Sequence, residues 1–330
     1  MSQPLWEAIV GQHQAVALLR RAVAADRVAH AYAFVGPAGV GRRLTALAFA
    51  QACLCPRQGC GTCSACRRVA AESHPDCQRL TPTPPRDNPR GAAVIRIEQV
   101  RELAHWAALT PLEASRKVFI VDDADRMTLP TAQALLKTLE EPPPRTLLIL
   151  IVANPRALPP TVLSRCQSVR FRPLEEAQVA ALLETRGLDS AGSQLLARLC
   201  QGQVGRALGS DLAEVQRRRA AALALAATAL PRLGNRLDAA GLDRAVVAAY
   251  LEVYWLWYRD ALCLAAGGDP SLIVNADRGD DLAALAGRVP ATALADTLSA
   301  IKEAWLALEG NVSPRLVLEQ TLLAVASRAA

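Results

Sequence analysis

Gly36-Pro37-Ala38-Gly39-Val40-Gly41-Arg42-Arg43 is a phosphate-binding loop in which two working side chains are replaced. Such a loop reads G-x-x-x-x-G-K-[ST]: its backbone N–H groups cradle the phosphates, the lysine reaches the β- and γ-oxygens, and the hydroxyl binds Mg²⁺. Here Arg42 and Arg43 stand at the lysine and hydroxyl positions. Residues 30–35 before the loop predict a buried strand, and residues 44–52 after it predict a helix. These flanks favour a nucleotide fold over a chance glycine-rich turn.

The composition sets outer limits on the function. The chain has 330 residues, enough for two or three domains. No apolar run approaches the ~20 residues of a membrane span, and the first ten residues lack a basic region followed by an apolar segment. We therefore expect a cytoplasmic protein that does not bind a membrane. The formal net charge of +6 and the isoelectric point near 9.0 permit contact with nucleic acid or with acidic partners.

A cysteine-rich segment follows the predicted helix. In an intracellular chain, cysteines favour metal binding or buried thiols over disulfides. Four of them are close enough in sequence to surround Zn²⁺ tetrahedrally: Cys55, Cys60, Cys63 and Cys66. Alternative first ligands are Cys53, His74 and Cys77; Cys55 is preferred because it lies beside the turn, whereas Cys53 would still be on the helix. Since no general base accompanies the cysteines, we expect a structural zinc module, inserted at about 53–77.

A pair of acidic residues follows another predicted strand. Residues 117–121 are mostly apolar and run directly into Asp122 and Asp123. A central parallel strand would bring these carboxylates to the edge of the sheet where a nucleotide's Mg²⁺ binds. Asp122 occupies the metal-side position, and Asp123 stands where a hydrolysing enzyme usually has a glutamate that orients water. The shorter side chain weakens the case for hydrolysis, and an acidic turn without a ligand is the alternative.

The order of predicted elements defines the fold class. Strand and helix patterns alternate over residues 1–172, which predicts a parallel α/β sheet, and only helix patterns follow. Tyr250, Tyr254 and Tyr258 recur every fourth residue on one of these later helices. Such a stripe could stack nucleic-acid bases, but leucines accompany it and basic residues do not interleave, so we expect it in a core or an interface.

Several strings together resemble one known family, the AAA+ subunits of the bacterial replicative clamp loader, part of the DNA polymerase III holoenzyme. The resemblance covers essentially the whole chain and rests on the cysteine module and on His30-Ala31-Tyr32, His74-Pro75-Asp76, the residues Ala-Leu-Leu-Lys-Thr-Leu-Glu-Glu-Pro-Pro at 134–143, and Leu163-Ser164-Arg165-Cys166. The gap between Cys55 and Cys60 is shorter than is usual in that family. The resemblance implies an AAA+ domain with the zinc insertion at 1–172, a helical lid at 173–210 and a helical collar at 211–330.

The substitutions place the chain within this family. Motor subunits, gamma and tau, keep the lysine and threonine of the loop, an Asp-Glu pair, and an arginine in the lid. This chain has altered all three parts, and Gly205 falls where the lid arginine would be. The pattern resembles the delta-prime branch, which does not turn over ATP. We therefore expect no functional ATP binding at Gly36, Gly39, Gly41, Arg42, Arg43, Asp122 and Asp123.

The resemblance also implies a role for Arg165. In this family the Ser-Arg-Cys arginine, here between Ser164 and Cys166, projects into the ATP site of a neighbouring subunit as an arginine finger. The implied partners are the gamma/tau and delta subunits and, through the complex, the sliding clamp and primed DNA. Two alternatives stay open: an ATP-hydrolysing motor subunit in which Arg42 replaces lysine, and a zinc-anchored nucleic-acid-binding module without an ATP role.

Overall fold

The computed structural model describes residues 4–84, 93–227, 237, 242–310 and 312–329. They form two compact units. The first contains the chain up to Val179 together with Gln201–Leu208, and the second contains Ala180–Cys200 and the chain from Gly209 onward. Parts of the expected collar, residues 228–236 and 238–241, lie outside the described residues. The expected domain boundaries, after 172 and after 210, stay predictions.

One parallel sheet organises the first unit. Its strands are β1 Ala31–Val35, β2 Cys77–Leu80, β3 Lys117–Val121, β4 Thr146–Val152 and β5 Gln167–Arg170. They are arranged in the order β2-β3-β4-β1-β5. Ala33 of β1 pairs with Leu150 of β4 and with Ser168 of β5, so β1 lies inside the sheet. The parallel α/β prediction is confirmed, and the carboxyl ends of β1, β3 and β4 share one edge.

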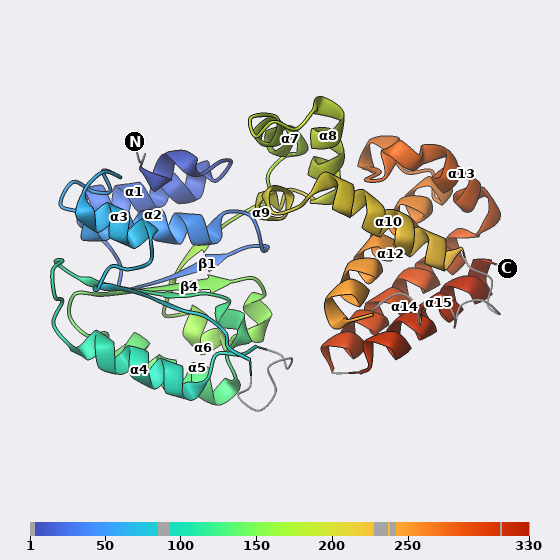
Figure 1. Ribbon diagram of the computed structural model, residues 1–330. Helices are drawn as coiled ribbons and strands as arrows, with labels where there is room; N and C mark the ends of the chain where they lie inside the picture. The colour runs from blue at the N-terminus through green and yellow to red at the C-terminus, as the bar shows by residue number, and fades with distance from the viewer. Residues whose placement is uncertain (1–3, 85–92, 228–236, 238–241, 311, 330) are drawn as a thin grey trace. The chain divides into compact units, whose positions relative to one another are not determined.

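Helices cover both faces of this sheet (Figure 1). One face carries α1 His13–Ala24, α2 Arg42–Leu54 and α3 Ser64–Ala70, and the other carries α4 Ile97–Ala108, α5 Leu129–Glu140 and α6 Pro160–Leu163. The apolar side chains of β4 alternate between the two faces, as a strand buried on both sides requires. Toward α2 they are Leu147, Ile149 and Ile151, and toward α4 and α5 they are Leu148, Leu150 and Val152.

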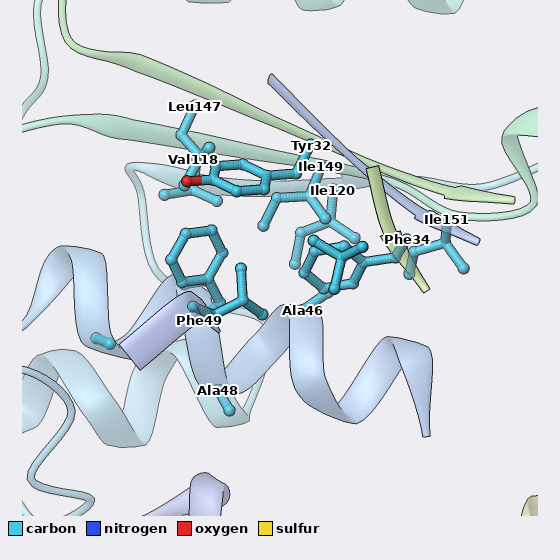
Figure 2. Packing of buried hydrophobic residues seen from close by; sticks show 14 of the residues in the cluster. Tyr32, Phe34, Ala46, Ala48, Phe49, Val118, Ile120, Leu147, Ile149 and Ile151 are labelled. Carbon is cyan, nitrogen blue, oxygen red and sulfur yellow. The ribbon is translucent and has the colours of Figure 1, made fainter. Parts of the chain in front are cut away.

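Aromatic contacts pack α2 against the sheet. Phe49 of α2 points toward Tyr32 and Phe34 of β1 (Figure 2). The Tyr32 and Phe49 rings meet edge to face with centroids 5.1 Å apart. Such a pair contributes roughly 0.5–1.5 kcal/mol beyond the area that it buries. Because α2 starts at the phosphate loop, this packing also holds the loop at the end of β1.

The edge strand β2 was not expected from the sequence. Residues 77–80 are few and half polar, so they show neither an apolar run nor a clear alternation. Directly before β2, the carboxylate of Asp76 accepts N–H groups from residues 112, 113 and 114 at 2.7–2.8 Å. Burial alone would raise the pKa of Asp76, but these three donors hold it below its ordinary value. Asp76 thereby ties the loop before β3 to the edge strand.

The second unit is helical. Its helices are α8 Ser190–Leu199, α10 Leu212–Ala226, α12 Arg244–Ala265, α13 Gly279–Arg288, α14 Ala291–Glu309 and α15 Pro314–Ala329. Two further helices are α7 Glu176–Glu184, which runs from the first unit into the second, and α9 Val204–Leu208, which belongs to the first. None of the described helices is long and apolar enough to cross a membrane.

The tyrosine stripe of α12 lies in the core of the second unit. Tyr250, Tyr254 and Tyr258 are all buried, and the Tyr254 hydroxyl donates to the Ala222 carbonyl of α10 at 2.9 Å. Burial raises the pKa of Tyr258 to about 12. The expectation of a packing role is confirmed, because buried rings do not present a face to a nucleic-acid base.

Candidate functional site

The phosphate loop connects β1 to α2, and two of its glycines adopt left-handed backbone conformations. Gly39 and Gly41 have φ values of 75° and 96°, which glycine adopts without a side-chain clash. Gly41 caps α2, and the Thr45 hydroxyl donates to its carbonyl at 2.9 Å. The loop therefore uses the conformational freedom of two of its glycines, and the alterations lie in the side chains at positions 42 and 43.

Arg42, at the lysine position, is buried rather than extended over the loop's exterior. Only 5% of this residue is exposed, and its Nη1 has no hydrogen-bond partner among the described residues. Burial lowers the pKa of Arg42, while the charges of Asp125, Asp123 and Asp122 work in the opposite direction. A planar guanidinium also differs from an ammonium in size and geometry, so Arg42 does not reproduce the lysine.

Arg43, at the hydroxyl position, begins a chain of ion pairs that ends on Asp122. Arg43 binds one oxygen of Glu72, and Arg79 binds the other at 2.5 Å. Arg79 also contacts Asp122, with Nη1 3.2 Å from Oδ2. Arg43 and Asp122 stand at the two positions that bind Mg²⁺ in an active phosphate-loop protein. In this chain they are connected to one another through Glu72 and Arg79.

This network sets the charge of Glu72. Partial burial opposes its ionisation, but the hydrogen bonds and charges of Arg43 and Arg79 hold the pKa of Glu72 below its ordinary value. The carboxylate therefore stays ionised at neutral pH and neutralises two arginines at the edge of the phosphate site.

Asp123 lies in the turn that follows β3. It adopts a left-handed backbone conformation with φ 45°, and its Oδ2 is 4.0 Å from Nε of Arg126. Burial and the neighbouring Asp122 raise the pKa of Asp123 above its ordinary value. Asp125, two residues on, accepts the N–H groups of Ala153 and Asn154 at 3.0 and 3.2 Å and so fixes the end of β4.

Gly205, on α9, contacts the backbone of the phosphate loop directly. Its N–H donates to the Gly39 carbonyl at 2.7 Å. A Cβ atom placed on Gly205 would lie 3.0 Å from the Gly39 Cα. At this distance a side chain, including the lid arginine of a motor subunit, needs the backbone of the loop to shift.

Arg165 lies between α6 and β5, and its guanidinium has two anchors. Nη1 donates to the Thr161 carbonyl at 2.9 Å, and Nη2 is 2.7 Å from Oε1 of Glu140. The side chain remains 36% exposed. A guanidinium carries five N–H donors, so donors remain for an acceptor that approaches from outside.

Ser164 and Cys166 support the turn that carries Arg165. The Ser164 hydroxyl donates to the Thr161 carbonyl at 3.1 Å, and the Cys166 thiol donates to the Val162 carbonyl at 3.4 Å. Burial raises the pKa of Cys166 to about 12, which keeps this thiol protonated. Both flanking residues therefore have a local structural role.

The four preferred cysteines come together. The sulfur atoms of Cys55, Cys60, Cys63 and Cys66 all lie within 4.8 Å of one another. Measured sulfur–sulfur distances are 3.6 Å for Cys55–Cys63, 3.8 Å for Cys55–Cys60 and 4.0 Å for Cys60–Cys66. Zn–S bonds of about 2.3 Å in a tetrahedron place sulfurs about 3.8 Å apart. The donor set and spacing fit a tetrahedral zinc ion.

Local hydrogen bonds favour the thiolate form of two of these cysteines, Cys55 and Cys60, whereas burial raises the pKa of Cys66 above its ordinary value. The N–H of Cys63 and the Thr62 hydroxyl lower the pKa of Cys60 to about 5. Burial alone would raise the pKa of Cys55, but nearby backbone N–H groups bring it below its ordinary value. Cys53 lies outside the cluster, and burial raises its pKa to about 12.

Three charged residues of these sites were missed by the sequence reasoning: Glu72, Arg79 and Glu140. Arg79 lies on the unexpected strand β2, and Glu72 lies in the turn after α3. Neither belongs to a recognisable motif. Glu140 lies within the string at 134–143 that carries the family resemblance, but no spacing rule connects it to Arg165 across the sequence.

A parallel sheet in this order, with a phosphate loop after β1 and carboxylates after β3, defines an AAA+ nucleotide fold whose own ATP site is altered. Residues 11–175 match the family model described as "DNA polymerase III, delta subunit", and residues 215–326 match its C-terminal counterpart. The chain therefore belongs to the DNA polymerase III delta-subunit family and is a subunit of the clamp-loader type.

Similar proteins share this affiliation. DNA polymerase III subunit delta' of Bacillus subtilis is 27% identical over 94% of this chain and 95% of its own length. The delta' subunit of Pseudomonas aeruginosa is 38% identical over 53% of this chain and 56% of its own length. The tau subunit of Escherichia coli is 29% identical over 61% of this chain but only 31% of its own length.

Proposed function

We propose that this chain is a non-hydrolysing subunit of the clamp loader that supplies Arg165 to the ATP site of a neighbouring subunit. In this role it joins gamma/tau and delta subunits and helps to load the sliding clamp on primed DNA. It does not turn over ATP by itself. The helical collar at 211–330 provides the contacts that hold it in the ring.

The position of Arg165 in the sheet carries this proposal. Arg165 precedes β5, whereas the phosphate loop follows β1, and these strands are parallel neighbours with Tyr32 opposite Gln167. The arginine and the loop are therefore at opposite ends of the sheet, separated by about 13 Å of strand at roughly 3.3 Å per residue. An arginine so placed cannot serve its own chain's loop, but it is available to another subunit.

The altered phosphate site supports the absence of turnover. Catalysis of phosphoryl transfer depends on a lysine and a metal ion that neutralise the developing charge. Here the lysine position holds a buried arginine, and Asp122 is engaged by Arg79. Gly205 also leaves no room for a lid arginine without a movement of Gly39.

We also propose that the four clustered cysteines hold a structural zinc ion. Bound zinc would cross-link the segment between α2 and α3 and keep the thiols deprotonated. Its role would be to stabilise this insertion, because all four positions of the tetrahedron are taken by protein ligands. The same segment leads into Glu72, so the zinc would also help to place the carboxylate that pairs with Arg43.

The test is a reconstituted clamp loader that carries Arg165→Ala, assayed in single-turnover ATP hydrolysis with clamp and primed DNA. Hydrolysis at the one ATP site that contacts this chain should slow by on the order of 10³-fold, as loss of an arginine finger does. A matched control is Arg156→Ala, since Arg156 is an exposed arginine of the same unit. Unchanged hydrolysis in an assembled Arg165→Ala complex would refute the arginine-finger role.

An ATP-hydrolysing motor subunit is the second candidate, because Gly39 and Gly41 keep the loop's backbone conformation. Equilibrium binding of ATP to the isolated chain separates the two functions. Our proposal expects no tight Mg²⁺-dependent binding. Tight binding, together with turnover that is lost in Asp122→Asn, would favour the motor.

A further inference from the structure

Glu140 contacts the guanidinium of Arg165 from a different helix. It is the last residue of α5, and Arg165 follows α6. The pair joins Oε1 of Glu140 to Nη2 of Arg165 at 2.7 Å, and the Thr161 carbonyl holds Nη1. Anchors on both terminal nitrogens define the plane of the guanidinium, whereas either one alone would leave it free to rotate.

The place of Glu140 in its own helix does not account for this glutamate. A carboxylate at the C-terminal end of a helix meets the negative end of the helix dipole, which is unfavourable. Helix α5 is already stopped by the prolines at 142–144, so Glu140 is not needed to end it. Its cationic partner compensates for the unfavourable position, and that partner is Arg165.

We infer that Glu140 is a positioning residue for the Arg165 finger, an inference that rests on the function proposed above. A free arginine side chain loses rotamer entropy when it is fixed on a phosphate. Holding the guanidinium beforehand removes part of that cost. Two of five donors face Glu140 and Thr161, and the side chain is still 36% exposed, so the remaining donors can meet a neighbour's phosphate.

The experiment compares Glu140→Gln with Glu141→Gln in the reconstituted complex. Both residues are exposed glutamates at the end of α5, and Glu140 is the one of the two paired with Arg165 in the described structure. Single-turnover hydrolysis at the site served by Arg165 should slow by up to about 5-fold in Glu140→Gln, the effect of a partly exposed ion pair. The amount of bound ATP should be unchanged, and Glu141→Gln should behave as the parent.

A double variant separates positioning from general structure. Once Arg165 is alanine, Glu140→Gln should cause no further slowing, because the group that it positions is gone. Further slowing in that background, an equal effect of Glu141→Gln, or faster hydrolysis in Glu140→Gln would each overturn the inference. If Arg165→Ala itself leaves hydrolysis unchanged, the proposed function fails; if only Glu140→Gln is silent, the function stands and the positioning role falls.

Discussion

The phosphate loop and the Arg165 turn belong to the same unit, but their charged side chains differ in what they contact. Around the loop, Arg43, Glu72, Arg79 and Asp122 satisfy one another, and Gly205 binds the loop's backbone. Around Arg165, two anchors orient the guanidinium and leave donors exposed.

On the function proposed above, this difference would let an AAA+ fold lose its own ATP turnover and keep a group that serves a neighbouring subunit. At the loop, ion pairs through Glu72 and Arg79 connect the two positions that would bind Mg²⁺ in an active phosphate loop. The arginine motif is at the opposite end of the sheet, and its chemistry does not depend on the chain's own loop. Changes to the loop's surroundings should therefore alter stability, while changes at Arg165 should alter turnover in the complex.

The largest effect on stability is expected from the metal site. Cys55→Ala should abolish tight binding of one zinc ion per chain, whereas Cys53→Ala should retain it, since Cys53 lies outside the cluster. If free zinc exceeds its dissociation constant a thousandfold, losing the site lowers the free energy of unfolding by about 4 kcal/mol. Metal analysis and thermal unfolding with and without a chelator measure both effects. Zinc loss in Cys53→Ala alone would show that the first ligand is misassigned.

A smaller effect is expected where α9 meets the loop. Gly205→Ala should lower the free energy of unfolding by about 1–2 kcal/mol, because the new methyl group would lie 3.0 Å from the Gly39 Cα. Gly287→Ala is the matched control, since a Cβ there meets nothing within 4 Å. Denaturant titrations of both variants give the comparison. Equal stability of Gly205→Ala and the parent would mean that α9 does not pack tightly against Gly39 of the phosphate loop.

The smallest effect concerns the pH dependence of Glu72. Its folded-state pKa lies below the ordinary value of 4.5, so its contribution to stability is present above that value and is lost as pH falls through the lower folded pKa. In Glu72→Gln, the decrease in stability on acidification should be shallower than in the parent. Urea titrations between pH 3 and pH 7, a range of about four units around the carboxylate pKa values, measure the difference. If the stability of Glu72→Gln and that of the parent changed identically with pH, Glu72 would not contribute to stability through these ion pairs.

Local patterns predicted much of the fold and part of the sites. The apolar strands 117–121 and 146–152, the loop between β1 and α2, and the four-cysteine cluster are each encoded in a continuous stretch. The edge strand β2 escaped prediction because an edge strand buries little and needs no apolar run. With β2 unrecognised, Arg79 could not be placed beside Asp122.

The sequence by itself determined the class of protein through its resemblance to a known family, which rests on short continuous strings such as Ser164-Arg165-Cys166. Only the tertiary structure decided what these groups contact. Glu72 and Arg79 reach Asp122 through the pairing of β2 with β3, Gly205 reaches Gly39 through the return of the chain at α9, and Glu140 reaches Arg165 through the packing of α5 on α6. Contacts between distant segments depend on sheet order and helix packing, which no local spacing specifies.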